Sequence, residues 1–178
     1  AAPGQTMDRI FRYFELDRSV KLSELDPEAY NTVSLAGEKF RFASGREAFI
    51  DQMASYFPAE KDALYRYISI IDRIASASTL NSLTSSERDM AASTEYMTLA
   101  INEVMDGIFK DEILKNVLVG DLPLYSAELD KTPFAQHAFI MDFYNQSAYR
   151  IAGGSDAIGF SLAKSIERMG GQILTRKK

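Results

Sequence analysis

Apolar side chains recur every three or four positions along most of the chain. This spacing is typical of helices that bury one face. It predicts helices over residues 7–16, 45–57, 58–75, 97–109, 112–118, 134–149 and 155–169. Residues 76–94 are rich in Ser, Thr and Ala and predict a mobile loop or a loosely packed helical linker. The pattern therefore indicates a mostly helical protein.

Three shorter segments alternate apolar and polar residues instead. They span residues 20–25, 30–35 and 38–42, and the last two are separated by Ala36-Gly37. Because glycine supplies the positive φ of a tight turn, the last two segments predict an antiparallel hairpin. Residues 172–175 also suggest a strand. We expect an α+β fold, mostly helical, with a small antiparallel β-sheet.

Helix ends are marked by local signals. Residues 44–47 have the S-x-x-E pattern of a capping box, in which Ser44 would cap the helix that follows. Ser155 is a candidate N-cap for the last helix, and Gly170 supplies its stop. A buried stripe is predicted on that helix, formed by Ile158, Leu162, Ile166 and Met169.

Composition narrows the classes of function. The chain has 178 residues, 46% of them hydrophobic and 25% charged, with a net charge of −5. An acidic balance with interspersed charges argues against a nucleic-acid-binding protein, which would present a basic face. Cysteine is absent, so disulfides and thiolate metal sites are excluded. No segment has the roughly 20 apolar residues of a membrane span.

Few residues suggest catalysis. The phosphate-binding glycine motifs and the G-x-S-x-G nucleophile motif are both absent. His137 is the single histidine, which excludes a multi-histidine metal site, and no metal is expected. On its apolar segment a hydrogen-bonded interior histidine is favoured over a lone base or ligand. Glu60 and Asp62 favour the dipole of the helix that they begin.

The aromatic segment 134–149 has two interpretations. Its composition favours a buried helix of the core. It could also line a tunnel for an apolar ligand, since such pockets have few polar groups. The segment contains Phe134, Phe139, Phe143, Tyr144 and Tyr149.

Residues 149–175 resemble a motif of FAD-dependent phytoene desaturases and their relatives. The matching positions are Tyr149, Gly153-Gly154-Ser155, Ala157-Ile158, Leu162-Ala163, Ile166-Glu167 and Gly170-Gly171-Gln172-Ile173. The retinol saturase branch looks most similar. Residues 25–30, 37–42, 46–50 and 56–64 resemble the hairpin and helices of the same family, so the likeness covers nearly the whole chain in order.

The resemblance implies a flavin enzyme that acts on an apolar polyene, either a retinoid or a carotenoid, by saturation, desaturation or isomerisation. Residues 1–150 would be its substrate-binding (cap) domain, and residues 151–178 the return to the FAD-binding domain. Gly153 and Gly154 would mark the seam. Substrate contacts would come from Phe134, His137, Phe139, Tyr144 and Tyr149. We expect a cytoplasmic protein, and a polyene substrate is compatible with peripheral membrane contact.

The family's dinucleotide fingerprint is missing from this chain. We therefore expect FAD in a longer parent protein but not on this fragment, which would be inactive alone. The strand begun at Gln172 should then lack partners. The competing interpretation is a non-enzymatic helical module that binds an apolar ligand or a partner protein.

Overall fold

The computed structural model describes residues 2–77 and 91–177. It divides into two compact units. We call Asp26–Ala148 the inserted unit, and Ala1–Leu25 with Tyr149–Lys178 the terminal unit. The divisions thus fall after residue 25 and after residue 148. The functional roles given to residues 1–150 and 151–178 stay predictions.

The inserted unit begins with the expected hairpin. Strand β2 (Asn31–Leu35) pairs antiparallel with β3 (Glu38–Phe42), with Asn31 opposite Phe42 and Leu35 opposite Glu38. Ala36 and Gly37 have φ values of 53° and 87°. A tight turn with two positive φ angles matches the natural twist of paired strands. The hairpin prediction is therefore confirmed, turn included.

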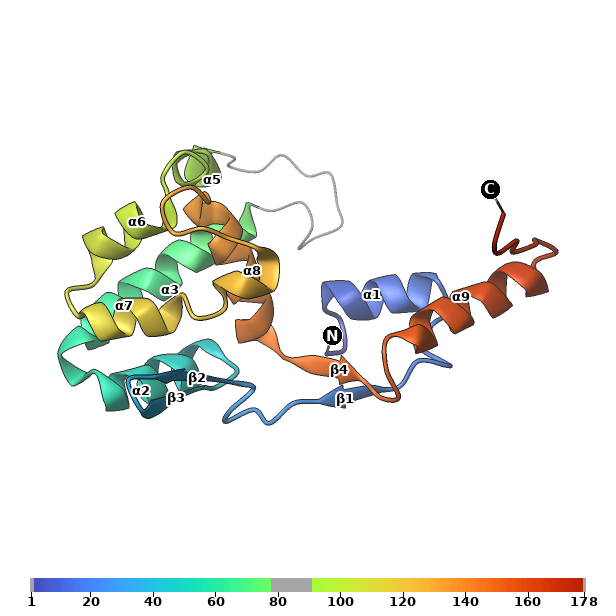
Figure 1. Cartoon of the computed structure of the whole chain (residues 1–178), viewed down its shortest axis with the longest axis horizontal. Helices are drawn as coiled ribbons and strands as arrows, with labels where there is room; N and C mark the ends of the chain where they lie inside the picture. Colours follow the sequence, from blue (N-terminus) through green and yellow to red (C-terminus); the bar gives the residue numbers. More distant parts are fainter. Residues whose placement is uncertain (1, 78–90, 178) are drawn as a thin grey trace. The chain divides into compact units, whose positions relative to one another are not determined.

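Helices form the rest of this unit (Figure 1). In chain order they are α2 (Arg46–Tyr56), the 3₁₀ turn η1 (Pro58–Glu60), α3 (Lys61–Ser76), α5 (Ala91–Tyr96), α6 (Ile101–Ile108), α7 (Glu112–Leu118), the 3₁₀ turn η2 (Leu122–Tyr125) and α8 (Phe134–Gln146). Helices α3 and α8 pack side by side, with α2 against α3. Residues 78–90, most of the expected loop or linker, lie outside the described residues.

The predicted apolar stripes supply the core of the inserted unit. Helix α2 buries Phe49, Ile50 and Met53, and α3 buries Leu64, Tyr67, Ile68, Ile71 and Ile74. The capping box is wrong, because Gly45 is the N-cap of α2 and no side chain caps it. Gly45 has a φ of 96°, and its N–H donates to the carbonyl oxygen of Asn145 at 2.8 Å. A backbone contact with α8 thus takes the place of the expected Ser44 cap.

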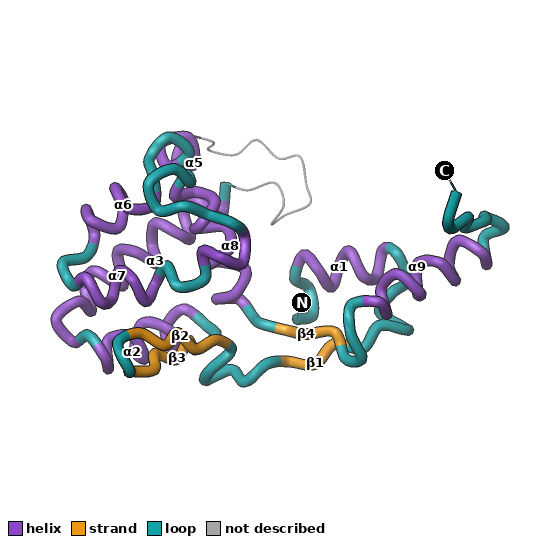
Figure 2. The backbone as a smooth tube through the Cα atoms, in the orientation of Figure 1, coloured by secondary structure: helices purple, strands orange, loops and turns teal. Residues whose placement is uncertain are grey.

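The terminal unit is built from the two ends of the chain, and each end contributes one helix and one strand (Figure 2). Helix α1 (Thr6–Tyr13) precedes β1 (Leu22–Glu24), which pairs antiparallel with β4 (Tyr149–Ile151) ahead of α9 (Asp156–Arg168). Ile158 and Leu162 pack against a small core of Phe11, Leu16 and Val20. The fold class is as predicted: helices predominate, and the described strands form two small antiparallel sheets.

Two expectations for the terminal unit fail. Ile166 and Met169 are 38% and 75% exposed, so only half of the predicted stripe on α9 is covered. Ser155 is the N-cap, but its side chain makes no cap hydrogen bond.

Residues 172–175 are unpaired among the described residues, and Ile173 and Leu174 are exposed. The segment therefore lacks sheet partners, as predicted, and it does not form a strand, since a strand needs a neighbour to satisfy its backbone groups.

None of the helices in the described part of the chain has the length and apolarity that a membrane crossing requires.

A close backbone contact gives the first prediction. A Cβ added at Gly120 would lie 2.6 Å from Cγ2 of Val33 and 3.2 Å from the carbonyl oxygen of Val117. Gly120→Ala should therefore lower the free energy of unfolding by about 1–3 kcal/mol, since overpacking forces the hairpin and α7 apart. Urea denaturation measures this.

The matched control is Gly107→Ala. Gly107 lies within α6, and nothing lies within 4 Å of its built Cβ. This substitution should raise stability by about 0.5–1 kcal/mol, because alanine favours a helix. Equal effects of the two variants would contradict the predicted contact.

Candidate functional site

The single histidine lies at the centre of a buried polar cluster. His137 of α8 is 1% exposed. Its Nε2 is 2.8 Å from Oη of Tyr67 on α3, and its Nδ1 is 2.9 Å from Oη of Tyr125 in η2. Helices α3 and α8 bring the first two side chains together, and η2 adds the third. We call these three residues the His137 cluster.

Burial keeps His137 uncharged. It lowers the pKa of the imidazole to about 4, because the charged form loses its solvation. The same cause raises the pKa of Tyr67 well above its usual value. A neutral imidazole has one donor and one acceptor nitrogen, so one tyrosine donates to His137 and the other accepts from it. The cluster is fully hydrogen-bonded and carries no charge at neutral pH.

Aromatic rings enclose this cluster. The ring of Phe134 lies 5.6 Å from that of His137, and Phe109 lies 5.5 Å from Tyr67. Tyr96 is 5.8 Å from Phe134 on the side of α5. Such an environment suits packing of an uncharged side chain. This geometry agrees with the interior histidine that the sequence favoured over a free base or ligand.

Asp121 is a second buried polar group, close enough to the His137 cluster to affect the pKa of Tyr125. Asp121 is 8% exposed, and burial raises the pKa of its carboxyl group. One of its oxygens accepts from Nδ2 of Asn31 at 2.6 Å. Burial raises the pKa values of Tyr125 and Tyr30, and the charge of Asp121 adds a smaller effect in the same direction. Both phenols therefore stay protonated at neutral pH.

Tyr30 links this region to the end of α8. Its ring stacks on that of Tyr144 at 5.6 Å with an interplanar angle of 4°. Its buried hydroxyl has no hydrogen-bond partner among the residues that the structure describes, and neither has the side-chain amide of Asn145.

The five predicted substrate contacts are divided between the two units, four on α8 and one on β4. Phe134 and His137 lie together in the interior, with Phe134 fully buried. Phe139 is half-buried on α8, as is Tyr144. Tyr149 belongs to β4 of the terminal unit, where burial and Glu24 raise the pKa of its hydroxyl. The substrate-binding role of all five residues stays a prediction.

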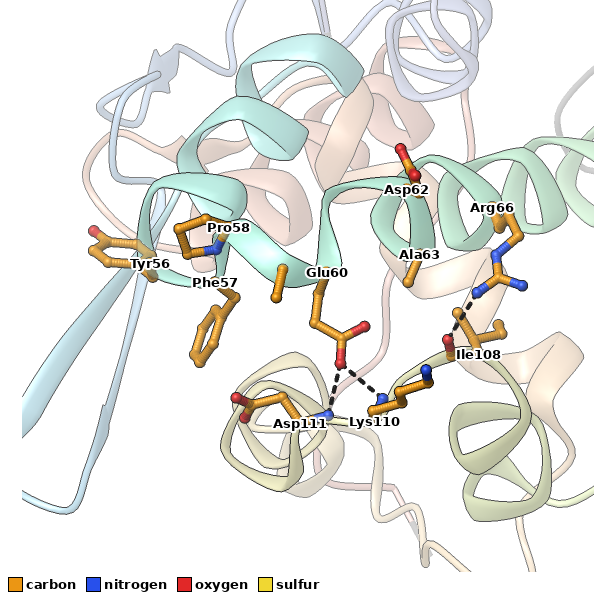
Figure 3. A pocket seen from close by; sticks show the side chains of 11 residues that line it. Tyr56, Phe57, Pro58, Glu60, Asp62, Ala63, Arg66, Ile108, Lys110 and Asp111 are labelled. Carbon is orange, nitrogen blue, oxygen red and sulfur yellow. Dashed lines mark hydrogen bonds between the residues drawn. The ribbon is translucent and has the colours of Figure 1, made fainter.

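Sequence reasoning missed the structural use of Glu60. This side chain is 7% exposed, and its Oε1 accepts the backbone N–H groups of Lys110 and Asp111 at 2.8 and 2.7 Å (Figure 3). It lies in a cavity of about 610 Å³, where Nη2 of Arg66 donates to the carbonyl oxygen of Ile108 at 3.2 Å. Glu60 thereby ties the start of α3 to the connection between α6 and α7.

The position of Glu60 in the sequence could not reveal its contact with Lys110 and Asp111, since acidic residues are common near the start of a helix. By contrast, Asp111 makes a local contact: it caps α7 by accepting the N–H groups of Ile113 and Leu114 at 2.8 and 3.0 Å. Both hydrogen bonds that Glu60 accepts from backbone N–H groups use Oε1, which gives this buried carboxylate a structural role.

The geometry bears on two kinds of site: a metal site and a phosphate-binding turn for a flavin dinucleotide. No group of three or more His, Cys, Asp or Glu side chains in the described ranges is arranged for a metal ion. Gly153 and Gly154 have φ values of 85° and 101° and lie between β4 and α9. A dinucleotide site needs a parallel βαβ unit at such a turn, whereas β4 pairs antiparallel with β1. The Gly153-Gly154 turn therefore differs in its surroundings from the pyrophosphate-binding turn of a βαβ unit.

Comparison with known proteins identifies relatives. All-trans-retinol 13,14-reductase of Rattus norvegicus is 29% identical over 157 residues, and that of Homo sapiens is 24% identical over 157 residues. The enzyme of Danio rerio is 20% identical over 151 residues. The alignments cover 77–78% of this chain. The matches support a relationship to the retinol saturase family.

The similarity to these reductases covers only part of their length. This chain spans 25% of the length of each of these reductases. No family model matches it, and no solved structure matches it significantly. The relationship that the sequence motifs suggested is thus supported by proteins from several vertebrates.

The second prediction concerns His137. Its folded pKa of about 4 lies below the unfolded value of about 6.5, so only the unfolded chain binds a proton between them. Stability should be full above pH ~6.5 and fall by about 3 kcal/mol as the pH drops towards 4. Because the chain has one histidine, NMR can follow its imidazole directly.

His137→Gln is the control, since it removes the titrating ring. Its unfolding free energy should depend less steeply on pH over the same interval. An imidazole that titrates near its ordinary value would show that the His137 cluster is open to water.

The third prediction concerns Glu60. Glu60→Ala leaves two backbone donors without their acceptor and should lower the free energy of unfolding by about 2–4 kcal/mol. Glu60→Gln keeps one acceptor oxygen and should cost less. Asp62→Ala, an exposed position two residues along, should change stability by less than about 1 kcal/mol. Thermal and urea unfolding measure the series, and comparable losses for Asp62→Ala and Glu60→Ala would refute the assignment.

Proposed function

We propose that this chain is the substrate-binding region of a FAD-dependent oxidoreductase that acts on a retinoid. The observation that carries the proposal is the similarity to all-trans-retinol 13,14-reductases over 78% of the chain. Because those enzymes are more than three times as long, the chain would correspond to one region of such an enzyme. The rest of the parent would provide the flavin site.

The role of this region would be to hold the apolar substrate. Reduction of a carbon–carbon double bond needs a hydride and a proton, and a reduced flavin supplies the hydride in enzymes of this kind. The protein then contributes binding, orientation and exclusion of water. The half-buried aromatic side chains of α8 supply apolar surface of the kind that lines sites for such ligands.

Within α8, Phe139 and Tyr144 are the residues best suited to touch a substrate. Both are half-buried, so part of each side chain remains available for contact. Phe134 and His137 have relative exposures of 0% and 1%, and they support the same helix from inside. Tyr30, stacked on Tyr144, would hold that ring in a fixed orientation.

The test is made on the full-length parent. Loaded with FAD and a reductant, it should reduce all-trans-retinol, with product followed by chromatography. Phe139→Ala should raise KM by about tenfold, the effect of losing roughly 1.4 kcal/mol of apolar contact. Met97→Ala, at an exposed position of the same unit, is the control and should leave KM unchanged.

Two further results would separate the alternatives. The 178-residue chain mixed with FAD should lose the flavin on gel filtration, whereas the parent should retain it. Stoichiometric flavin on the chain alone would contradict the assignment to a substrate-binding region. A parent without flavin or retinol turnover would favour the non-enzymatic helical module.

A further inference from the structure

Helices α1 and α9 line an apolar groove in the terminal unit. Its volume is about 750 Å³. Tyr13 and Phe14 lie on one side, with Leu162, Ile166 and Met169 on the other. Tyr13 is 81% exposed and Met169 is 75% exposed. The groove is therefore lined by large side chains that water would otherwise touch.

The terminal unit exposes more apolar surface than its size warrants. It has less than a third of the residues, yet it holds eight of the fifteen exposed large hydrophobic side chains found in the described part of the chain. They are Met7, Tyr13, Phe14, Phe160, Ile166, Met169, Ile173 and Leu174. Its own core of Phe11, Leu16 and Val20 is small. Four of these side chains, Tyr13, Phe14, Ile166 and Met169, line the groove together, and an exposed apolar patch of this kind is typical of an interaction surface.

Charge distinguishes this unit from the inserted one. Residues 1–25 and 149–178 hold ten Lys and Arg against six Asp and Glu, whereas residues 26–148 hold ten against nineteen. Arg18 and Arg168 line the groove, and Arg168 pairs with Glu15. An apolar occupant that carries acidic residues beside Arg18 would be complementary to this surface.

We propose that the groove docks a segment of the same polypeptide that lies outside these 178 residues, with apolar side chains and an acidic flank. The proposal rests on the proposed function only in taking the parent to be as long as its relatives, of which this chain spans 25%. A segment of the same chain is present at high effective concentration, so a groove of this size suffices to hold it.

Two other occupants fit the face less well. A symmetric dimer through this face would bring two basic units together, which costs electrostatic energy. A lipid surface has no side-chain ridge to fill a concave groove, whereas a helix lays such a ridge into one.

Thiol labelling tests the proposal directly. The chain has no cysteine, so Tyr13→Cys and Met169→Cys each introduce one reactive group at the groove. Leu124→Cys, 69% exposed in the inserted unit, is the matched control. In the parent with its other cysteines replaced by serine, maleimide should label positions 13 and 169 at least about tenfold more slowly than in the 178-residue chain. The control should react equally in both.

The acidic flank has its own test. In the parent, Arg18→Glu should speed labelling of the Met169→Cys variant, because the charge facing the occupant is reversed. Lys131→Glu, at an exposed site of the inserted unit, should leave the rate unchanged. Equal effects of these two charge reversals would contradict the acidic flank.

Other outcomes overturn the proposal. Equal labelling of positions 13 and 169 in chain and parent would mean that nothing in the parent covers the groove. Protection that grows with protein concentration would indicate a second copy, and protection that requires anionic phospholipid vesicles would indicate a bilayer. None of these measurements uses retinol turnover, so they remain decisive if the proposed function fails.

Discussion

The packing of α3 against α8 is the interaction on which the inserted unit depends. Tyr67 and His137 meet at this contact, and each would be a buried polar group at considerable cost if the other were absent. Because η2 must also deliver Tyr125, the hydrogen bonds fix the position of a third element as well as the two helices. Apolar surface drives the helices together, while this cluster specifies one alignment between them.

Ion pairs and a backbone hydrogen bond also fix the position of α2 against α3 and α8. Arg46, the first residue of α2, bonds Asp72 of α3 at 2.5 Å and the buried Asp142 of α8 at 3.1 Å. The neighbouring Gly45 donates to the end of α8. The start of α2 is therefore held by its neighbours through charge and backbone hydrogen bonds, where the sequence suggested a self-contained Ser44 cap. Helix α2 is positioned by tertiary contacts more than by its own signals.

Sequence patterns predicted the features that depend on residues close together in the chain. The hairpin followed from alternation around Ala36-Gly37, and the core of the inserted unit followed from apolar spacing. The side-chain contacts that the sequence did not reveal join residues far apart in the chain. Glu60 meets Lys110 and Asp111 across fifty positions, and His137 meets Tyr67 across seventy. The exposed stripe on α9 is similar, since periodicity reveals an apolar face but not whether anything covers it.

The insertion of one unit into the other constrains how the chain folds. Pairing β1 with β4 closes a loop that contains all of residues 26–148. For an unstructured loop of that length the entropic cost is about 4 kcal/mol, more than two three-residue strands can repay. If the inserted unit folds first, its ends are already held by structure and most of that cost disappears. The terminal unit would then assemble last and open first, which makes it the less protected part of the chain in hydrogen exchange.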